Sequence, residues 1–395
     1  MTVPETLIEL FDTRPLENVL GVEVFRPRRV VYVCADTVAS DTKLREKLRG
    51  YFSCRGLHPE LVFLRASVYD ANTVYMVLRR AALRYPDCAV DITGGTDAVL
   101  FAAGRLCAEL SLPVVTYSRK KNRFFNIQNA PFVEDAPVEL RYSVSDYFRM
   151  AGGSMRQGRV NNAVLSSYLQ DIDPFFEVFM KYRKQWDRIV TYIQRVSPPG
   201  QAAEPTTHAH GSYEVKGDRG NKITCPEPAL RELEKIGLLR NLQVVPQQEI
   251  SFSFRDLQIR SWLRDVGSVL ELYVWKACQD AGSFDDVILS AVVDWDGDEF
   301  AGTVTNELDV AATSGLIPVF LSCKTCEVKT EALNELAILR DRFGGQMARA
   351  AVVTSELGGS AMRSRAAELG IDVIDRTELE PQRLLPRLRG MLRNK

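Results

Sequence analysis

The sequence lacks long apolar runs, an excess of charge of either sign, and signals for export. No stretch approaches the ~20 apolar residues that a membrane-spanning helix needs, so we expect no contact with the membrane interior. Lys and Arg number 50 against 51 Asp and Glu, so net charge does not indicate a strongly basic nucleic-acid-binding protein. Local basic clusters can still contact phosphate, because that contact depends on where the charge lies.

Closely spaced cysteines are also scarce. The N-terminal segment MTVPETLIELFDTRP is acidic and lacks the basic start and apolar centre of a signal peptide, so we expect a cytoplasmic protein with reduced cysteines. Cys323 and Cys326 form the one close pair, and the absence of a second pair nearby argues against a zinc site. His208 and His210 could bind a metal, but solvated loop histidines are the commoner case.

What the chain does contain is an alternation of β-rich runs and helical stretches over residues 28–150. The runs RRVVYVCAD, HPELVFLRAS, DCAVDITGG and LPVVTYSR are separated by segments of helical spacing, and RFFNIQ adds a strand that can be antiparallel. Repeated strand–helix–strand units of this length predict a mostly parallel, doubly wound sheet. We therefore predict an α/β, Rossmann-like domain over residues 1–150.

The remainder divides into a connector and a second α/β unit. Residues 151–247 contain long helical stretches and the segment SPPGQAAEPTTHAHGSYEVKGDRGN, whose Pro, Gly, Ala and Thr content predicts a loop. Residues 248–395 are expected to open with a helix over RSWLRDVGSVLELYVWKACQDAG, followed by three strands and then by alternating helices and strands. The connector is predicted to be helical.

The third strand of the first unit ends in a turn with two glycines, Thr93-Gly94-Gly95-Thr96. In an open parallel sheet, ligands bind at the carboxyl ends of the strands. Glycines let backbone N–H groups approach a phosphate, threonines add hydroxyls, and the next helix offers its N-terminus to an anion. The alternative is a tight turn that needs glycine for its geometry alone, and this pattern by itself does not separate the two.

Two further segments follow strands at the same edge of that sheet. Asp36 and Thr37 come after the first predicted strand and could help to line a pocket. The basic run at 119–123 follows the fourth strand, and a solvated turn is its simplest interpretation. Neither a GxGxxG fingerprint nor a P-loop lysine is found, so neither a nicotinamide cofactor nor a nucleoside triphosphate is indicated.

Two carboxylates and a lysine stand out in the second unit. Asp309 lies in the apolar run of TNELDVAAT, and Lys324 ends LIPVFLSCK, so a short connection would place the two strands side by side. A buried core does not accept such charges unless they are paired or neutralised. Glu271, in the helix segment GSVLELYVW, is either a salt-bridged helix residue or a third member of the site.

This set of residues suits metal-dependent phosphodiester hydrolysis. Carboxylates and a backbone carbonyl, here that of Cys323, are the hard oxygen donors that Mg²⁺ or Mn²⁺ prefers. The metal would polarise the phosphodiester and activate water, while Lys324 would position that water and offset charge at phosphorus. Glu335 on the next helix, or Glu307, is expected to support the lysine. We therefore predict a nuclease with catalytic residues Glu271, Asp309, Lys324 and Glu335, and with a metal held by Glu271, Asp309 and the Cys323 carbonyl.

The motifs also resemble a known family. DITGGTDAVLFAAGRL resembles the glycine turn of CRISPR-associated Rossmann-fold (CARF) sensor domains, and GSVLELYVW, NELDV and FLSCKT resemble successive motifs of PD-(D/E)XK nucleases. Their order is similar to that of the cyclic-oligoadenylate-activated nucleases of type III CRISPR antiviral defence. The resemblance implies a homodimer that shares one cyclic tetra-adenylate and, with Mn²⁺ or Mg²⁺, cuts single-stranded DNA, supercoiled DNA, single-stranded RNA, or several of these. It implies ligand contacts from Asp36, Thr37, Thr93, Gly94, Gly95 and Thr96.

One residue departs from the family pattern. Ser322 stands where the (D/E)-X-K step has an acidic residue, and a hydroxyl is a poor replacement for a metal-binding carboxylate. Either Glu271, Glu307 or Glu335 supplies the missing charge, or the site binds metal weakly. Two alternatives therefore stay open: a cyclic-oligoadenylate-binding regulator with an inactive nuclease fold, and a constitutive restriction-type endonuclease with a purely structural Rossmann-like domain.

Overall fold

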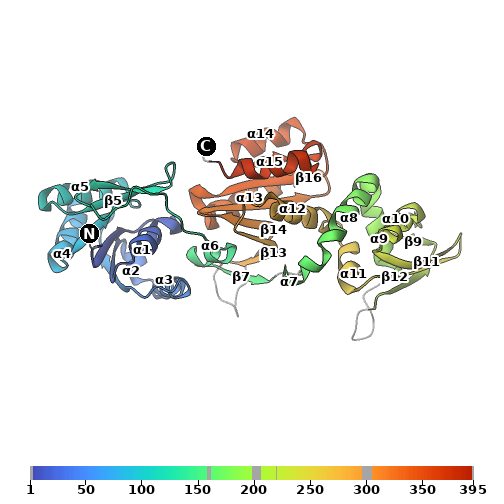
Figure 1. Cartoon of the computed structure of the whole chain (residues 1–395), viewed down its shortest axis with the longest axis horizontal. Helices are drawn as coiled ribbons and strands as arrows, with labels where there is room; N and C mark the ends of the chain where they lie inside the picture. Colours follow the sequence, from blue (N-terminus) through green and yellow to red (C-terminus); the bar gives the residue numbers. More distant parts are fainter. Residues whose placement is uncertain (1–2, 158–161, 198–205, 219, 296–304, 394–395) are drawn as a thin grey trace.

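The computed structural model describes residues 3–157, 162–197, 206–218, 220–295 and 305–393, which form three units in a row (Figure 1). The N-terminal unit lies at one end of the row, and the unit containing the C-terminal segment lies in the middle. The green and yellow unit from the centre of the sequence lies at the other end. Among the described residues, no helix has the length and apolar character needed to cross a membrane.

The first unit contains a six-stranded sheet of order β3-β2-β1-β4-β5-β6, parallel except for β6. This confirms the predicted doubly wound sheet and the antiparallel RFFNIQ strand. The strands are β1 (Thr6–Leu10), β2 (Arg29–Cys34), β3 (Glu60–Arg65), β4 (Cys88–Asp91), β5 (Val114–Ser118) and β6 (Arg123–Gln128).

The central strand β1 was missing from the sequence prediction. Its five residues, TLIEL, are all buried although one of them is a glutamate, and the acidic surroundings concealed a short apolar strand. β1 lies between β2 and β4, so the chain reverses its direction of travel across the sheet there. Such a switch point is where open α/β sheets bind ligands at the carboxyl ends of their strands.

Helices cover both faces of this sheet. Side chains of α1 and α3 share one apolar cluster with β1 and β2, while α4 and α5 share another cluster with the opposite face of the same strands. The helical elements are η1 (Pro15–Asn18), α1 (Leu20–Phe25), α2 (Asp36–Ser40), α3 (Thr42–Cys54), α4 (Ala71–Arg84) and α5 (Asp97–Leu110).

The middle unit of the row has a mixed sheet of order β17-β16-β15-β14-β13-β7. β13, β14 and β15 are antiparallel neighbours, whereas β15, β16 and β17 are parallel. Its strands are β7 (Ser154–Gln157), β13 (Asp286–Asp294), β14 (Thr305–Ser314), β15 (Ile317–Lys324), β16 (Arg349–Thr354) and β17 (Asp372–Ile374).

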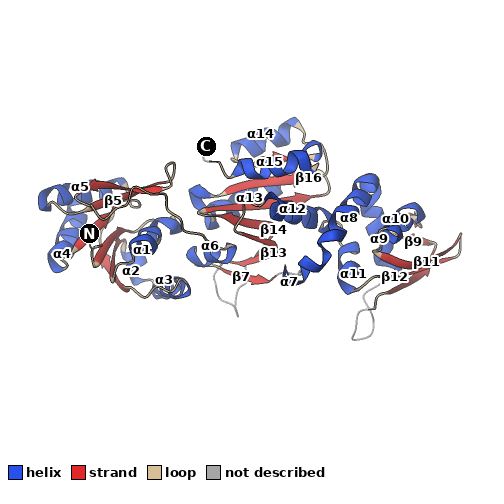
Figure 2. Ribbon diagram, viewed as in Figure 1, coloured by secondary structure: helices blue, strands red, loops and turns tan. Residues whose placement is uncertain are grey.

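This sheet is also covered on both faces, as Figure 2 shows. One face packs against α12 and α15, and the other packs against α6, α13 and α14. The helical elements of this unit are α6 (Val144–Met150), α12 (Ser268–Ala281), α13 (Thr330–Phe343), η4 (Gly345–Met347), α14 (Ser360–Glu368), η5 (Arg376–Glu378) and α15 (Pro381–Met391).

The far unit combines helices with a three-stranded sheet of order β11-β12-β8 and a β9–β10 hairpin. The predicted loop is therefore wrong where β8 and β9 lie, because these short, polar strands lack an apolar run. His210 on β8 is exposed, and its Nε2 lies 3.1 Å from Glu249 Oε2. The elements are α7 (Asn162–Leu165), η2 (Ser166–Tyr168), α8 (Leu169–Tyr182), η3 (Arg183–Gln185), α9 (Trp186–Val196), β8 (His208–Ser212), β9 (Glu214–Lys216), β10 (Lys222–Thr224), α10 (Glu227–Lys235), β11 (Leu239–Val245), β12 (Glu249–Phe254) and α11 (Leu257–Leu263).

Two sheet pairings cross the domain boundary expected at residue 247, because each joins a strand of the expected connector to a strand that follows it. β7 pairs with β13 in the middle unit, and β12 pairs with β8 in the far unit. The helix expected from residue 260 onwards is in fact two helices, α11 and α12. Asp265 Oδ1 accepts hydrogen bonds from the N–H groups of Gly267 and Ser268, at 2.8 and 3.0 Å, and so stabilises a new helix start.

The first and middle units are in direct contact. The tight turn between β14 and β15 reaches the first unit, where the N–H of Tyr142 donates to Gly315 O at 3.3 Å. Within the middle unit, the hydroxyl of Tyr147 on α6 donates to Leu316 O at 2.5 Å and holds the same turn. Leu316 and Met347 are members of the same apolar cluster as the β1 and β2 side chains of the first unit. The two units therefore share buried apolar surface.

Candidate functional site

Asp309, midway along β14, and Lys324, at the end of β15, are brought together. Asp309 Oδ2 accepts three hydrogen bonds: from Cys323 N at 2.6 Å, from Ser322 Oγ at 3.1 Å and from Lys324 Nζ at 3.3 Å. Burial acts to lower the pKa of Lys324, but the carboxylate of Asp309 outweighs it, and the pKa is raised overall. The lysine is therefore a cation held against a carboxylate.

Glu271 faces this pair from α12. Burial, followed by the charges of Asp309, Asp265 and Glu307, raises the pKa of Glu271 to about 8, while Lys324 opposes the rise. Space for the carboxyl group depends on Gly267, since a Cβ there would lie 2.6 Å from Glu271 Oε1. The carboxyl groups predicted from the sequence therefore lie close together, and their negative charge exceeds the positive charge of Lys324.

Glu307 and Glu335 line the same small cavity of about 50 Å³, together with Asp309, Ser322 and Lys324. Their hydrogen bonds join other groups of the site. Glu335 Oε1 accepts a hydrogen bond from Asn306 Nδ2 at 2.6 Å, and Glu307 accepts one from the hydroxyl of Ser290. The lysine is bonded to Asp309 instead.

Ser290 was missed by the sequence analysis. Continuing the β13–β14 and β14–β15 registers places Ser290, Asp309 and Ser322 in one row across three strands. Ser290 is buried and has a φ of 56°, the left-handed region that serine seldom adopts. Such strain clusters at functional sites. In the sequence, Ser290 is an ordinary serine in an apolar strand, so neither its backbone strain nor its position beside Asp309 could be recognised.

The donors present fit a divalent cation in their chemistry. Across the described stretches, no group of three or more His, Cys, Asp or Glu side chains is placed to hold a metal. Glu271, Asp309 and the Cys323 carbonyl are nevertheless hard oxygen donors, and a cation would offset the carboxylate charges that add to burial in raising the pKa of Glu271. The Cys323 thiol is not a suitable ligand, because burial, with Asp309 next in effect, raises its pKa well above the usual value.

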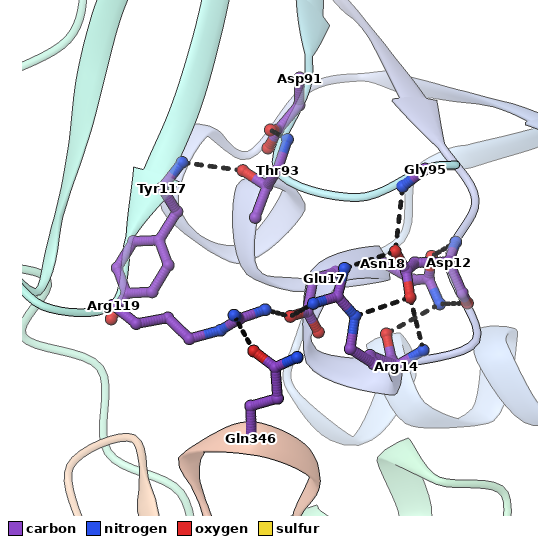
Figure 3. A network of polar contacts seen from close by, with 10 residues as sticks. All are labelled: Asp12, Arg14, Glu17, Asn18, Asp91, Thr93, Gly95, Tyr117, Arg119 and Gln346. Atoms are coloured by element: carbon purple, nitrogen blue, oxygen red, sulfur yellow. Dashed lines mark hydrogen bonds and ion pairs between the residues drawn. The ribbon is translucent and has the colours of Figure 1, made fainter. Parts of the chain in front are cut away.

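The glycine turn of the first unit lies between the ends of β1 and β4, at the switch point (Figure 3). The N–H of Gly95 donates to Asp12 Oδ2 at 3.0 Å, and Gly95 has a φ of 98°, which requires glycine. A Cβ on Gly94 would lie 2.7 Å from Leu10 O. The turn therefore packs closely on the end of β1.

The two threonines of the turn have structural partners. Thr93 Oγ1 accepts a hydrogen bond from Tyr117 N at 2.8 Å, and Thr96 Oγ1 donates to Val68 O at 3.0 Å. These bonds tie β4 and α5 to the neighbouring segments. The hydroxyls thus stabilise the turn itself, whatever further contacts they make.

Asp36 and Thr37 lie on the exposed start of α2, which follows β2. β1 separates β2 from β4, so these residues are two strands away from the glycine turn. Asp36 pairs with Arg65 Nη1 at 3.1 Å on β3. In the described structure the residue beside the turn is Asp12, which sequence analysis missed together with β1.

Asp12 belongs to a network of charged side chains (Figure 3). Arg14 donates to Asp12 from Nε at 2.9 Å and from Nη2 at 2.7 Å. Burial acts to raise the pKa of Asp12, but the bonds from Arg14 and Gly95 outweigh it and the pKa is lowered. Arg119 pairs with the buried Glu17, so the solvated turn expected at 119–123 is wrong for this residue.

The fold and these two sites define a class of protein: a Rossmann-like domain with a glycine turn at its switch point, joined to an α/β domain with a carboxylate–lysine site. Residues 260–395 match the family model described as Card1-like, endonuclease domain. This match confirms the predicted nuclease class for that part of the sequence.

Solved structures agree with the fold along the whole chain. Protein VC1899 from Vibrio cholerae has a TM-score of 0.73 and 16% identity, covering 98% of this chain and 99% of its own. Can2 from Sulfobacillus thermosulfidooxidans, in complex with cyclic tetra-adenylate (cA4), has a TM-score of 0.73 and 16% identity, covering 99% and 98%. At such identity the likeness concerns the fold. No curated protein sequence matches the chain.

Proposed function

We propose that this protein is a metal-dependent nuclease of type III CRISPR antiviral defence that cyclic tetra-adenylate activates. The observation that carries the proposal is the Asp309–Lys324 pair inside a Card1-like endonuclease domain. The sensor part is supported by the glycine turn at the switch point and by the fold shared with Can2, which is solved with that ligand.

The order of elements around the site supports a PD-(D/E)XK type of nuclease. α12 carries Glu271, the antiparallel strands β13, β14 and β15 follow, and Asp309 and Lys324 lie on the second and third of them. α13 and β16 then complete the sheet. We assign Glu271, Asp309 and the Cys323 carbonyl as the donors that would hold Mn²⁺ or Mg²⁺. When bound, such an ion supplies Lewis-acid polarisation of the phosphodiester and a more acidic water.

The side chains themselves have distinct tasks. Lys324, kept cationic by Asp309, orients the attacking water and offsets the negative charge that grows on the phosphoryl oxygens. Asp309 uses Oδ2 for its three hydrogen bonds, so that Oδ1 can face a cation. Glu335 and Glu307 line the cavity and orient groups around it. Ser322 holds Asp309 in place rather than acting as a donor of charge.

In the sensor domain, the amides of the turn at Thr93–Thr96 and the start of α5 are assigned to a phosphate of the ligand. Asp36 and Thr37 remain proposed contacts from the outer part of the same edge. We further propose a cytoplasmic homodimer that shares one cyclic tetra-adenylate and cuts single-stranded DNA, supercoiled DNA or single-stranded RNA.

A cleavage assay tests this proposal. Supercoiled plasmid, single-stranded DNA and single-stranded RNA are incubated with Mn²⁺, with and without cyclic tetra-adenylate, using wild type and Asp309→Ala. Cutting that needs the ligand and is lost in the variant supports a gated nuclease and identifies its substrate. Equal cutting without ligand contradicts the gating.

A second candidate is a ligand-binding regulator with an inactive nuclease fold. It is favoured by the serine at position 322, whose hydroxyl bonds to Asp309 where the family pattern has an acidic group. This candidate predicts measurable binding of cyclic tetra-adenylate by calorimetry, with no cutting of any substrate in Mn²⁺ or Mg²⁺.

A further inference from the structure

A continuous set of polar contacts leaves the glycine turn toward the endonuclease domain (Figure 3). It begins with the Gly95 N–H on Asp12 and continues through the two hydrogen bonds from Arg14 to Asp12. Arg14 Nη1 lies 3.7 Å from Glu17 Oε1, and Glu17 also pairs with Arg119. Glu17 and Asp12 are buried carboxylates, so each depends on these arginines for compensation of its charge.

Arg119 carries the set of contacts across the domain boundary. Its Nη1 donates to Oε1 of Gln346, which is 227 residues away in the sequence. Gln346 lies in η4, and the next residue, Met347, is buried in the apolar cluster of the sensor domain. The contact is thus anchored on both sides.

η4 is connected to the catalytic cavity by a single helix. It follows α13, and α13 carries Glu335 on its second turn, where this residue lines the cavity with Lys324. A helix moves as a rigid element, so a displacement of η4 along α13 changes the position of Glu335. Gln346 therefore lies at the sensor end of an element whose other end is in the proposed active site.

The arginines of this set can exchange partners. The Gly95 N–H, close to the start of α5, is a natural position for a phosphate oxygen, and it donates to Asp12 Oδ2. A phosphate there would compete with Asp12 for that N–H and would attract the guanidinium groups of Arg14 and Arg119. Both arginine side chains are partly exposed.

We propose that the Arg119–Gln346 contact is a latch that holds the endonuclease domain in its resting arrangement. A ligand phosphate at the glycine turn opens this latch by displacing Asp12 from Gly95 and drawing Arg119 away from Gln346. The inference rests on the proposed function for its ligand, cyclic tetra-adenylate, and it adds the residues through which binding reaches the catalytic cavity.

The test compares two substitutions of one exposed residue. Gln346→Ala removes the acceptor, and Gln346→Glu replaces it with a carboxylate that pairs with Arg119 more strongly. Because binding and latch opening are linked, the alanine variant should bind cyclic tetra-adenylate about three- to tenfold more tightly and the glutamate variant more weakly by a similar factor. Gln279→Ala, an exposed glutamine on α12, is the matched control and should bind like wild type.

Affinity is measured by calorimetry on the full chain in EDTA, so the result does not depend on cleavage. In Mn²⁺, Gln346→Ala should also cut without ligand about three- to tenfold faster than wild type, by the same reasoning. Wild-type affinity in both Gln346 variants, or the reverse order, overturns the latch while leaving the proposed function intact. Failure of wild type to bind the ligand overturns both.

Discussion

Glu9 and Asp91 occupy paired positions on the parallel strands β1 and β4, and both side chains are buried. Glu9 Oε1 and Asp91 Oδ2 have no hydrogen-bond partner in the described part of the chain. Gly21 of α1 closes over them, since a Cβ would lie 2.4 Å from Asp91 Oδ2 and 2.8 Å from Glu9 Oε1. Burial raises the pKa of Asp91 to about 7, and burial together with Asp91 raises the pKa of Glu9 well above its usual value.

This pair should make the protein less stable as the pH rises. Unfolded carboxyl groups titrate near pH ~4, so between about pH 4 and 7 the folded state binds more protons than the unfolded state. The free energy of unfolding therefore falls across that range, on the order of 4 kcal/mol for the shift of Asp91 alone. Asp91→Asn should remove the part of this slope that comes from Asp91 and raise the melting temperature at pH 8, while buried Glu9 keeps a slope of its own.

Thermal unfolding of wild type and Asp91→Asn from pH 4.5 to pH 8 checks this expectation. Asp97→Asn, which changes an exposed aspartate of the same domain, is the control and should keep the wild-type slope. Parallel curves for wild type and Asp91→Asn would mean that the pair does not hold a proton in the folded state.

Lys324→Met should abolish most cleavage without affecting the sensor domain. Methionine keeps much of the apolar side-chain volume but removes the charge that Asp309 holds at 3.3 Å. Loss of one charged stabiliser of a phosphoryl transition state is expected to lower the single-turnover rate by about 100-fold or more. Calorimetry should show unchanged ligand affinity. Lys184→Met, at an exposed lysine of the far unit, is the control, and a wild-type rate in Lys324→Met would remove the lysine from the mechanism.

Metal affinity should rise with pH because of Glu271. Its carboxyl group, with a pKa raised to about 8 in the metal-free protein, must ionise before it can bind a cation. Mn²⁺ should therefore bind more tightly from pH 6 to about pH 8, by up to about tenfold per unit. Glu271→Gln should bind weakly with no such slope, whereas Glu331→Gln, at an exposed position of α13, should behave as wild type. Titration with Mn²⁺ followed by electron paramagnetic resonance measures this, and an equal slope in Glu271→Gln would exclude the residue as a ligand.

Gly95→Ala should weaken ligand binding and also destabilise the sensor domain. The residue has a φ of 98°, and an added Cβ would lie 3.0 Å from Leu10 Cβ, so the expected cost is about 1–3 kcal/mol. Gly104→Ala is the matched control, because it lies inside α5 with nothing within 4 Å of the added Cβ. That control should be neutral or slightly stabilising. Calorimetric affinity equal to wild type in Gly95→Ala would place the ligand away from this turn.

Local patterns were sufficient for most elements and failed where polar residues interrupt a strand. The apolar runs ending in Asp91 and Lys324 were recognisable, because a buried strand needs consecutive apolar residues. β1 was overlooked because Glu9 interrupts its short apolar run. That glutamate is tolerated in the core because its raised pKa favours the neutral, protonated form and because Gly21 leaves space for its carboxyl group. β8 was overlooked because its residues are polar, and because it is a strand only through its backbone pairing with β12.

The sequence alone determined the nuclease class and the pairing of Asp309 with Lys324. Asp309 and Lys324 are fifteen residues apart on adjacent strands joined by a tight turn, so their proximity follows from the local sequence. The tertiary structure alone decided that Asp12 binds the N–H of Gly95, that Ser290 joins the row of Asp309, and that Arg119 reaches Gln346. The Asp12–Gly95 and Arg119–Gln346 contacts join segments far apart in the sequence, and their positions depend on how whole sheets and domains pack against each other. Periodicity along a chain carries no information about that packing.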